Sequence, residues 1–520
     1  MPLTSSAALD RAYDVCIVGA GPAGLACAFD CHDAGLKTLV LEAGGHNPIP
    51  GAPDILAADI SDPAWHDPIS IVAASALGGT SHWWGGRCVP LDAADFRDWP
   101  IAEADMAPWW EKAAAFLGAR GVSESPAPAG FEKLARFDAR RDESWGPERN
   151  MARRWRARLR SRAGPAIVRH ARVTSLDIEA GRVTGLRVRT GALEKSVRAD
   201  QIVLACGGLG VLRLLLLAQR TQPALFGGAD GPLGRGYMGH LTGSISAITL
   251  AEPANVQAFA CRMLDRGVYA RRRLRPTEAA LRAGPFNNIA FWLDNPSQAR
   301  DNLAAFGRAL ATRLATIVGK NGRLGLHIGQ FKHAPLSAVV GLSGAVFQFA
   351  YAKLNGGYPG AVDLIPDASG AWRLSYHGEQ LRNLRNRVRL GEARDSLGLP
   401  KLAIDFEMTE ADFESVLAAH EALDADLRES GLGALRFDAG RKETLEAIAS
   451  AARDGYHQLG GAAMSTDPSA GVVNAQCRAH DVENLWIASS CVFASGGQAN
   501  PTLTIVALAR RIAATLAGHA

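Results

Sequence analysis

The stretch YDVCIVGAGPAGLACAFDCHDAGLKTLVLEAGG, residues 13–45, has the pattern of a strand, a tight turn, a helix and a second strand. Val15 to Val18 form a short apolar run, which is typical of a buried parallel strand. The glycines that follow have the spacing G-x-G-x-x-G, and each serves a separate purpose. Gly19 permits the sharp turn, Gly21 leaves room for a pyrophosphate, and Gly24 lets the helix pack on the strand.

The end of the second strand extends this pattern. Glu42 is placed to accept hydrogen bonds from a ribose, which favours FAD or NAD over NADP. The amino terminus of the helix would direct its partial positive charge at the phosphates. Three glycines alone could form an ordinary turn, but the complete unit with its terminal acid predicts dinucleotide binding.

Two later stretches fit the same type of domain. ALGGTSHWWGGRC, residues 76–88, suits a backbone that passes close to a flat ligand such as a flavin, although by itself it could be a loop with buried tryptophans. ADQIVLACGGLGVLRLLLLA, residues 199–218, predicts a strand, a glycine turn and a helix. A strand so late in the chain indicates that the FAD domain is assembled from separate segments.

The composition limits the class of protein. The 520 residues are expected to form two closely joined domains, and contents of 48% hydrophobic and 21% charged residues are ordinary for a soluble globular protein. A net charge of +4 does not indicate a nucleic-acid partner. The eight cysteines include no C-x-x-C pair, and no metal site is predicted. Metal-ligand spacing is also lacking among four of the histidines: His82, His170, His240 and His480.

Four further stretches lead to predictions about the location of the protein and about its surface. The start MPLTSSAALDRAYD has no basic segment followed by an apolar one, so no signal peptide is expected and a cytoplasmic location fits best. Residues 334–352 carry no charge and are long enough for a membrane span. Because both halves of the chain must build one site, we expect a buried helix or cavity wall there rather than a membrane contact. The basic clusters at residues 152–162 and 271–275 are expected to be solvated faces.

The carboxyl-terminal block is the most specific part of the sequence. It contains GYHQLGGAAM, residues 455–464, and GVVNAQCRAHDVENLWIASSCVFASGGQANPTLTIVALARRIA, residues 471–513. With the stretches above, it resembles the glucose–methanol–choline (GMC) family of FAD-dependent oxidoreductases. The resemblance covers roughly residues 12–100, 165–245 and 450–520, whereas residues 246–450 contain no motif that aligns. The segment GGQANPTLTIVALA is similar to the bacterial sugar-oxidising branch and to pyranose oxidases.

The resemblance implies an α/β fold with a doubly wound, Rossmann-like FAD-binding domain and an α+β substrate-binding domain. The FAD-binding domain would comprise residues 1–115, 163–245 and 450–520, with a connecting or lid segment at 116–162 and the substrate-binding domain at 246–449. His457 falls on the family's catalytic histidine, and Asn500 on its second active-site residue. The implied FAD contacts are Gly19, Gly21, Gly24, Glu42, Gly78, Gly79, Thr80, Ser81, Trp84, Gly85, Val173, Ala205, Gly207, Ser490, Pro501 and Thr502.

The sequence departs from the family pattern at three places. Trp83 stands where members with covalently linked FAD carry a histidine, and His82 is one residue early, so we expect non-covalent FAD. Ser489 replaces the usual acidic residue before the last strand's S-x-V-F motif. GGAAM replaces G-T-x-x-M beside His457, which could alter the pocket there.

The residues that match the family permit a specific chemistry. Oxidation of an alcohol removes a proton from the hydroxyl and a hydride from the carbon. We expect flavin N5 to take the hydride and His457 to act as the base, because histidine titrates near working pH. Asn500 is expected to hold the substrate oxygen and to cap the helix whose first residue is Pro501.

The substrate and the electron acceptor are less well determined. The expected substrate is a small-molecule alcohol, with a sugar or glycoside first on the branch resemblance and a lipophilic alcohol still open. The acceptor is left open among oxygen, a quinone and a cytochrome. Rival functions are a flavin subunit that passes electrons to a cytochrome, a non-redox lyase, and a flavin-binding protein without turnover.

Overall fold

The computed structural model describes residues 6–48, 56–121, 124–161, 163–264, 267–295, 364 and 366–518. The uncharged stretch at residues 334–352 lies outside these ranges, so the expectation for it stays a prediction. Within the ranges, no helix combines the length and the apolar character needed to cross a bilayer.

A parallel five-stranded sheet forms the nucleotide-binding core. Each pair of neighbouring strands runs parallel, and most of their residues are buried, as expected for strands covered on both faces. The strands come from stretches far apart in the chain, in the order β20 (Leu485–Ile487), β10 (Ala199–Leu204), β1 (Tyr13–Val18), β2 (Thr38–Glu42) and β6 (Ala166–Arg169). The prediction of a domain assembled from separate segments is therefore confirmed.

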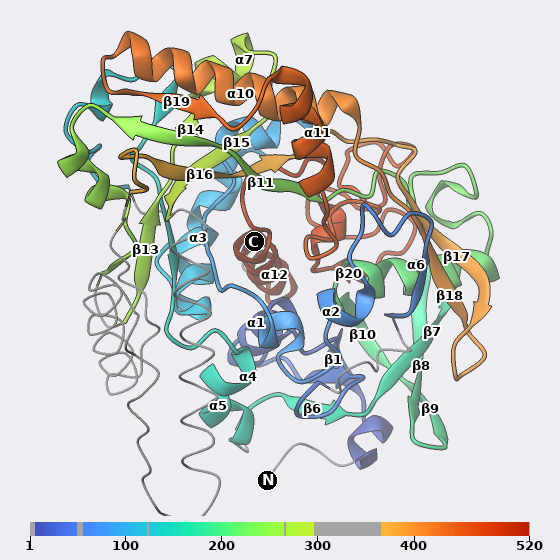
Figure 1. Cartoon of the computed structure of the whole chain (residues 1–520). Helices are drawn as coiled ribbons and strands as arrows, with labels where there is room; N and C mark the ends of the chain where they lie inside the picture. Colours follow the sequence, from blue (N-terminus) through green and yellow to red (C-terminus); the bar gives the residue numbers. More distant parts are fainter. Residues whose placement is uncertain are drawn as a thin grey trace, which may run out of the picture.

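Helices and a small β-meander pack against this sheet. Helix α1 (Pro22–Asp33) contacts β1 and β2, and it also contacts α12 (Thr502–Leu516), which contacts α3 (Glu103–Leu117). Helix α6 (Gly208–Thr221) follows β10, as predicted from residues 199–218. The meander consists of β7 (Arg172–Glu179), β8 (Arg182–Thr190) and β9 (Leu193–Val197). The α/β, Rossmann-like fold predicted from the sequence is confirmed (Figure 1).

A second, antiparallel sheet lies above the first in Figure 1, beneath helix α10 (Glu410–Glu429). Its strand order is β15 (Ile289–Asp294), β16 (Trp372–Glu379), β11 (His240–Leu250) and β19 (Gly433–Phe437). Helix α10 packs on β19, and α11 (Arg441–Ala451) packs on β11. In the β11–β16 pairing His240 lies opposite Glu379, and His377 lies opposite Thr242. This register brings two histidines to the start of β11, where the chain leaves the nucleotide-binding part.

Smaller sheets join segments that the sequence assigned to different domains. Strand β3 (Ala58–Ile60) pairs with β18 (Pro400–Asp405), which pairs with β17 (Arg387–Arg394). Strand β5 (Asp142–Trp145) pairs with β13 (Tyr269–Arg272), and that strand pairs with β12 (Arg262–Met263). The remaining short strands and α-helices of the described residues are β4 (Phe137–Asp138), β14 (Arg275–Pro276), α2 (Ile69–Val72), α4 (Met151–Arg154), α5 (Arg156–Arg160) and α7 (Glu278–Ala283). The domain boundaries stay a prediction.

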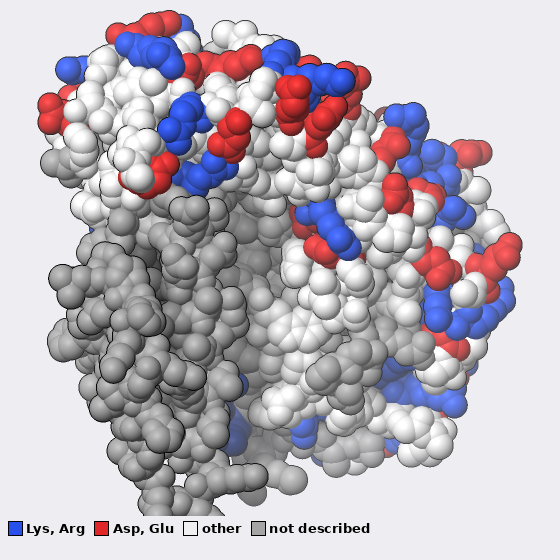
Figure 2. Space-filling model, viewed as in Figure 1, with Lys and Arg blue, Asp and Glu red and all other residues white. Residues whose placement is uncertain are grey.

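Charges of both signs are interspersed over α10, α11 and the β17–β18 hairpin on the face that Figure 2 shows. Many of them form exposed ion pairs, such as Arg441 with Glu414 and Arg389 with Asp405. Exposed pairs of this kind add little to stability, typically about 0–1 kcal/mol each. The informative charges of this protein are therefore the buried ones.

Candidate active site

A cavity of about 680 Å³ lies at the carboxyl ends of the parallel strands, a volume typical of cofactor and small-molecule sites. Its wall is formed by segments from the beginning, the middle and the end of the chain. Most of the residues predicted to contact FAD line it: Gly19, Gly21, Glu42, Gly79, Thr80, Ser81, Trp84, Gly85, Val173, Ala205, Gly207, Ser490, Pro501 and Thr502. His457 and Asn500 line it as well.

Gly24 and Gly78 do not line this cavity, and both have a packing reason to be glycine. A Cβ on Gly24 would lie 2.0 Å from the carbonyl oxygen of Gly19, so only glycine lets α1 approach the end of β1. Gly78 has a left-handed backbone with φ of 94°, which non-glycine residues rarely adopt. Its N–H donates to the carbonyl of Ala20 and so fixes the loop that follows.

Two long helices begin at the cavity wall without a capping side chain. Helix α1 starts after Gly21 and helix α12 starts after Pro501, and neither position has a side-chain cap hydrogen bond. The free N–H groups and the helix dipole give each such end a partial positive charge, which favours phosphates and other anions. The prediction that Asn500 caps the last helix is wrong, because Pro501 occupies the N-cap position and the Asn500 side chain contacts His457 instead.

Glu42 is buried at the end of β2 and binds two loops together. Its two carboxylate oxygens accept hydrogen bonds from the backbone N–H groups of Ala20 and Gly44, each at 2.8 Å. Burial raises the pKa of Glu42 to about 7, although the two N–H groups act in the opposite direction. The carboxylate lies in the cavity wall, so further hydrogen-bond donors from a ligand have access to it.

His457 lies between a carboxylate and an amide. Its Nδ1 is 3.2 Å from the Oδ2 atom of Asp454, and its Nε2 is 3.2 Å from the side-chain nitrogen of Asn500. The amide nitrogen donates to Nε2, so the ring proton belongs on Nδ1 and faces Asp454. This tautomer leaves Nε2 as the basic atom of the ring. The sequence analysis missed Asp454, although it stands only three residues before His457.

Asp454 is almost completely buried and accepts several backbone hydrogen bonds. Its Oδ1 accepts from the N–H groups of Gly455, Tyr456 and His457, and its Oδ2 accepts from the N–H of His240. Burial alone would raise the pKa of Asp454, but the neighbouring His457 ring and these N–H groups outweigh it and lower the pKa. The carboxylate is therefore charged, and it joins β11 to the loop that carries His457.

Replacing Asp454 with asparagine should destabilise the protein by about 1–3 kcal/mol at pH 7, because the amide group leaves buried N–H groups without an acceptor. The folded-state pKa of Asp454 lies below its ordinary value of 3.8. The stabilisation is thus complete above that value and disappears as the pH falls through the lowered pKa. Urea unfolding of both proteins between pH 7 and pH 3 measures this, and a stability difference that does not shrink in acid would contradict it.

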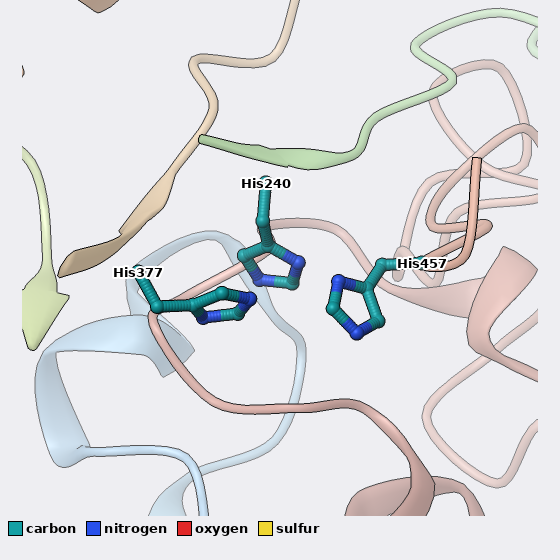
Figure 3. Close-up of side chains that lie close together, drawn as sticks. All are labelled: His240, His377 and His457. Carbon is teal, nitrogen blue, oxygen red and sulfur yellow. The ribbon is translucent and has the colours of Figure 1, made fainter. Parts of the chain in front are cut away.

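Two further histidines lie next to His457, as Figure 3 shows. The rings of His240 and His377 are stacked with centroids 4.2 Å apart, and His457 stands nearly perpendicular to both, at 4.7 Å and 5.2 Å. Burial, followed by the neighbouring histidine rings, lowers the pKa of His240 and His377 well below the usual range. Both rings are therefore neutral. No sequence signal indicated this cluster, because its members come from β11, β16 and a distant loop.

The basic cluster at residues 271–275 is not a solvated face, so that prediction is wrong. Arg271 and Arg273 are buried, with Arg273 only 1% exposed, and both approach the buried carboxylate of Glu143. Pairing of β13 with β5 places these charges together. Arg273 also contacts Gln498, two residues before Asn500. In the other cluster, the described residues 152–161 are mostly exposed or half-buried, as expected.

FAD fits this cavity on several independent features. The uncapped start of α1 suits the pyrophosphate, and a Cβ on Gly21 would have only the Cα of Gly79 nearby, at 3.9 Å, so the space beside it is open. Glu42 suits the ribose, and the backbone around Gly79, Thr80 and Gly85 suits a flat ring. His457 and Asn500 line the same cavity. The class of protein that this arrangement defines is a flavin-dependent oxidoreductase.

Comparison with protein families gives a more specific assignment. The GMC oxidoreductase model matches residues 383–509, and a pyridine nucleotide-disulphide oxidoreductase model matches residues 13–217. The chain is a FAD-dependent oxidoreductase of the GMC type. The first match begins at residue 383, so the family resemblance extends into the stretch 246–450, in which the sequence analysis found no motif.

Curated relatives match over nearly the whole chain. The 6'''-hydroxyparomomycin C oxidase of Streptomyces lividus is 24% identical, with 98% of this chain and 92% of that protein covered. The 2-methyl-1,2-propanediol dehydrogenase of Mycolicibacterium austroafricanum is 22% identical, with 96% and 94% covered. The paromamine 6'-oxidase of Streptomyces fradiae is 23% identical, with 98% and 92% covered.

Solved structures support the same fold. The pyridoxine 4-oxidase from Mesorbium loti superposes with a TM-score of 0.56 at 17% identity, and 96% of this chain and 98% of that chain are covered. A FAD-dependent oxidoreductase from Chaetomium thermophilum superposes with a TM-score of 0.53 at 16% identity, with the same coverage of 96% and 98%. At these sequence identities, the superpositions show a similar fold and nothing about function.

Proposed function

We propose that this enzyme oxidises a CH–OH group of a sugar or glycoside to a carbonyl, with His457 as the base. The observation that carries the proposal is the pairing of His457 Nε2 with the Asn500 amide at 3.2 Å, in the wall of a cavity that fits FAD. A basic nitrogen and an amide donor at one place can hold one hydroxyl oxygen and take its proton.

The residues of the chain have separate parts in this reaction. His457 Nε2 takes the hydroxyl proton, and Asn500 orients the oxygen that loses it. Asp454 lies beside Nδ1, so its negative charge stabilises the ring once it carries both protons, as a buried aspartate does in a catalytic triad. Bound FAD supplies the two-electron oxidant for the carbinol carbon. The start of helix α12 favours the negative charge that reduction adds at that end of the cavity.

The substrate class rests on the relatives. Two of them are named for hydroxyparomomycin C and paromamine, which are glycosides, and a third for a diol. We infer that a polyol-like substrate, a sugar or glycoside, occupies the space beside His457. Trp83 and Tyr456 also line the cavity and are 40% and 51% exposed, so aromatic faces are available for a sugar ring.

We further propose that the FAD is held without a covalent bond. His82 does not line the cavity, and both of its ring nitrogens already have partners: Nε2 contacts the carbonyl of Leu77 and Nδ1 contacts Asn150, each at 3.0 Å. Trp83, which faces the cavity, offers no nucleophilic atom. Heat or acid precipitation should release all the flavin into the supernatant.

An anaerobic screen of alcohols tests the proposed substrate class. Sugars and glycosides are expected to bleach the absorbance of bound FAD, whereas sterols and terpenoid alcohols are expected to leave it unchanged. Reoxidation of the bleached enzyme by air, a quinone or a cytochrome, followed by stopped flow, then identifies the electron acceptor. Bleaching by lipophilic alcohols alone would contradict the sugar assignment, and no bleaching by any alcohol would contradict the redox function.

A further inference from the structure

The three clustered histidines each direct one nitrogen into a shared space. Figure 3 shows His240, His377 and His457 converging on a common centre from three different segments of the chain. One nitrogen from each ring lies within 4.8 Å of the others. His240 is 0% exposed and His377 is 4% exposed, so this space is shielded from bulk water.

The hydrogen bonds on the outer side of two rings decide which nitrogens carry lone pairs. The Nε2 of His240 lies 3.0 Å from the carbonyl oxygen of Gly497, and the Nδ1 of His377 lies 2.7 Å from that of Gln498. A carbonyl can only accept, so these two nitrogens carry the protons. The other nitrogen of each ring is a bare lone pair, and among the described residues it has no hydrogen-bond partner.

Two buried lone pairs in one space are costly unless a proton donor or a cation lies between them. A histidine whose outer N–H is fixed by a backbone carbonyl is the usual arrangement of a metal-ligating imidazole. His457 Nδ1 faces the same space, and Asp454 beside it adds a negative charge. Arg273, whose positive charge acts on His377, is paired with Glu143 at 3.1 Å.

We propose that His240, His377 and His457 form a binding site for one divalent transition-metal ion, and that Zn²⁺ suits it well. Zn²⁺ takes neutral imidazole ligands at about 2.0–2.1 Å in tetrahedral geometry, which needs nitrogens roughly 3.4 Å apart. The observed upper limit of 4.8 Å means that the nitrogens must approach by at most about 1.4 Å, and the stacked rings of His240 and His377 must also turn until both lone pairs point at the ion. The sequence predicted no metal site, since its ligands share no local spacing.

Metal binding has a consequence for catalysis that rests on the proposed function. When the metal takes Nδ1 of His457, the ring proton moves from Nδ1 to Nε2, the Asn500 amide turns its oxygen towards that nitrogen, and no proton is gained or lost. Nε2 then has no lone pair for the hydroxyl proton. An occupied site is therefore an inhibited enzyme, and the metal acts as an off-switch for alcohol oxidation.

The experiment uses the FAD-loaded protein, freed of metal by a chelator and then dialysed against Zn²⁺ or Co²⁺. We expect one metal ion per chain, and with Co²⁺ the visible absorption bands of a four-coordinate ion. His377→Leu should weaken Zn²⁺ binding at least tenfold and remove these bands. His240→Leu should have the same effect, and retained flavin absorbance shows that each variant is folded.

His420→Leu is the matched control. His420 is equally buried, its Nδ1 also bonds to a backbone carbonyl and its Nε2 also has no hydrogen-bond partner among the described residues, but its ring neighbours are Phe291, Tyr376 and Phe437 rather than other histidines. This variant should bind Zn²⁺ as the natural protein does. No retained metal, or equal binding by the His377 and His420 variants, would overturn the site. If Zn²⁺ binds but does not slow the reduction of FAD by alcohol, the metal site is supported and His457 is not the base.

Discussion

Replacing His457 by alanine should slow the reduction of FAD by alcohol about 10²- to 10⁴-fold, which is the usual contribution of a positioned general base. FAD binding should persist, because the residues that fit the pyrophosphate and the ribose lie on other segments. His457 contacts Asn500 and Asp454 through its two ring nitrogens, so its loss removes both the proton acceptor and its charged support. Anaerobic stopped-flow measurement of flavin bleaching reports this single step.

His480→Ala is a suitable control for this experiment. His480 bonds to the carbonyl of Ser465 at 3.1 Å and does not line the cavity. Its replacement should leave the rate of bleaching unchanged within about twofold, since surface changes away from the site usually have small effects. Bleaching of the His457 variant at the rate of the natural protein would mean that another group takes the proton.

Replacing Gly24 by alanine should prevent stable folding of the FAD domain or cost at least about 1–3 kcal/mol. The new Cβ would lie 2.0 Å from the Gly19 carbonyl oxygen and 3.3 Å from the Ala205 Cβ. The nearest of these atoms belongs to the backbone of the phosphate-binding turn, which cannot move without displacing β1 or α1. Urea unfolding and the yield of FAD-loaded protein measure the effect.

Gly21→Ala is the informative contrast, because its Cβ would meet only the Cα of Gly79, at 3.9 Å. This variant should fold normally and lose FAD affinity, since the methyl group enters the cavity beside the helix start. Gly391→Ala, whose Cβ would make only ordinary contacts from 3.5 Å outward, should change neither property. Equal stability of the Gly24 variant and the natural protein would show that α1 does not need this close approach.

The sequence was sufficient for features that depend on neighbouring residues. The strand of residues 13–18, the turn at Gly19 and the helix from Pro22 follow from local patterns, because hydrophobic period and glycine spacing act over a few positions. The same holds for the strand and helix within residues 199–218. These elements supply part of the cavity wall, including Gly19, Gly21, Ala205 and Gly207.

The errors arose where long-range pairing decides the outcome. Arg271 to Arg273 looked like a surface cluster, since a run of cations has no local reason to be buried. Only the pairing of β13 with β5 brings Glu143 to them, and a carboxylate at contact distance offsets part of the cost of burying a charge. Asn500 was likewise assigned to the helix cap, but the helix begins one residue later and leaves its amide free for His457.

The amino-acid order alone predicted a nucleotide-binding unit at the start of the chain, and the family resemblance predicted His457 as an active-site residue. Only the tertiary structure decided what surrounds that histidine. The pairing of β11 with β16 and the turn at Asp454 place two neutral imidazoles and one carboxylate against it, from segments with no common spacing. Proton affinity and metal affinity depend on distances of a few ångströms between such groups, and these distances are set by folding rather than by position in the chain.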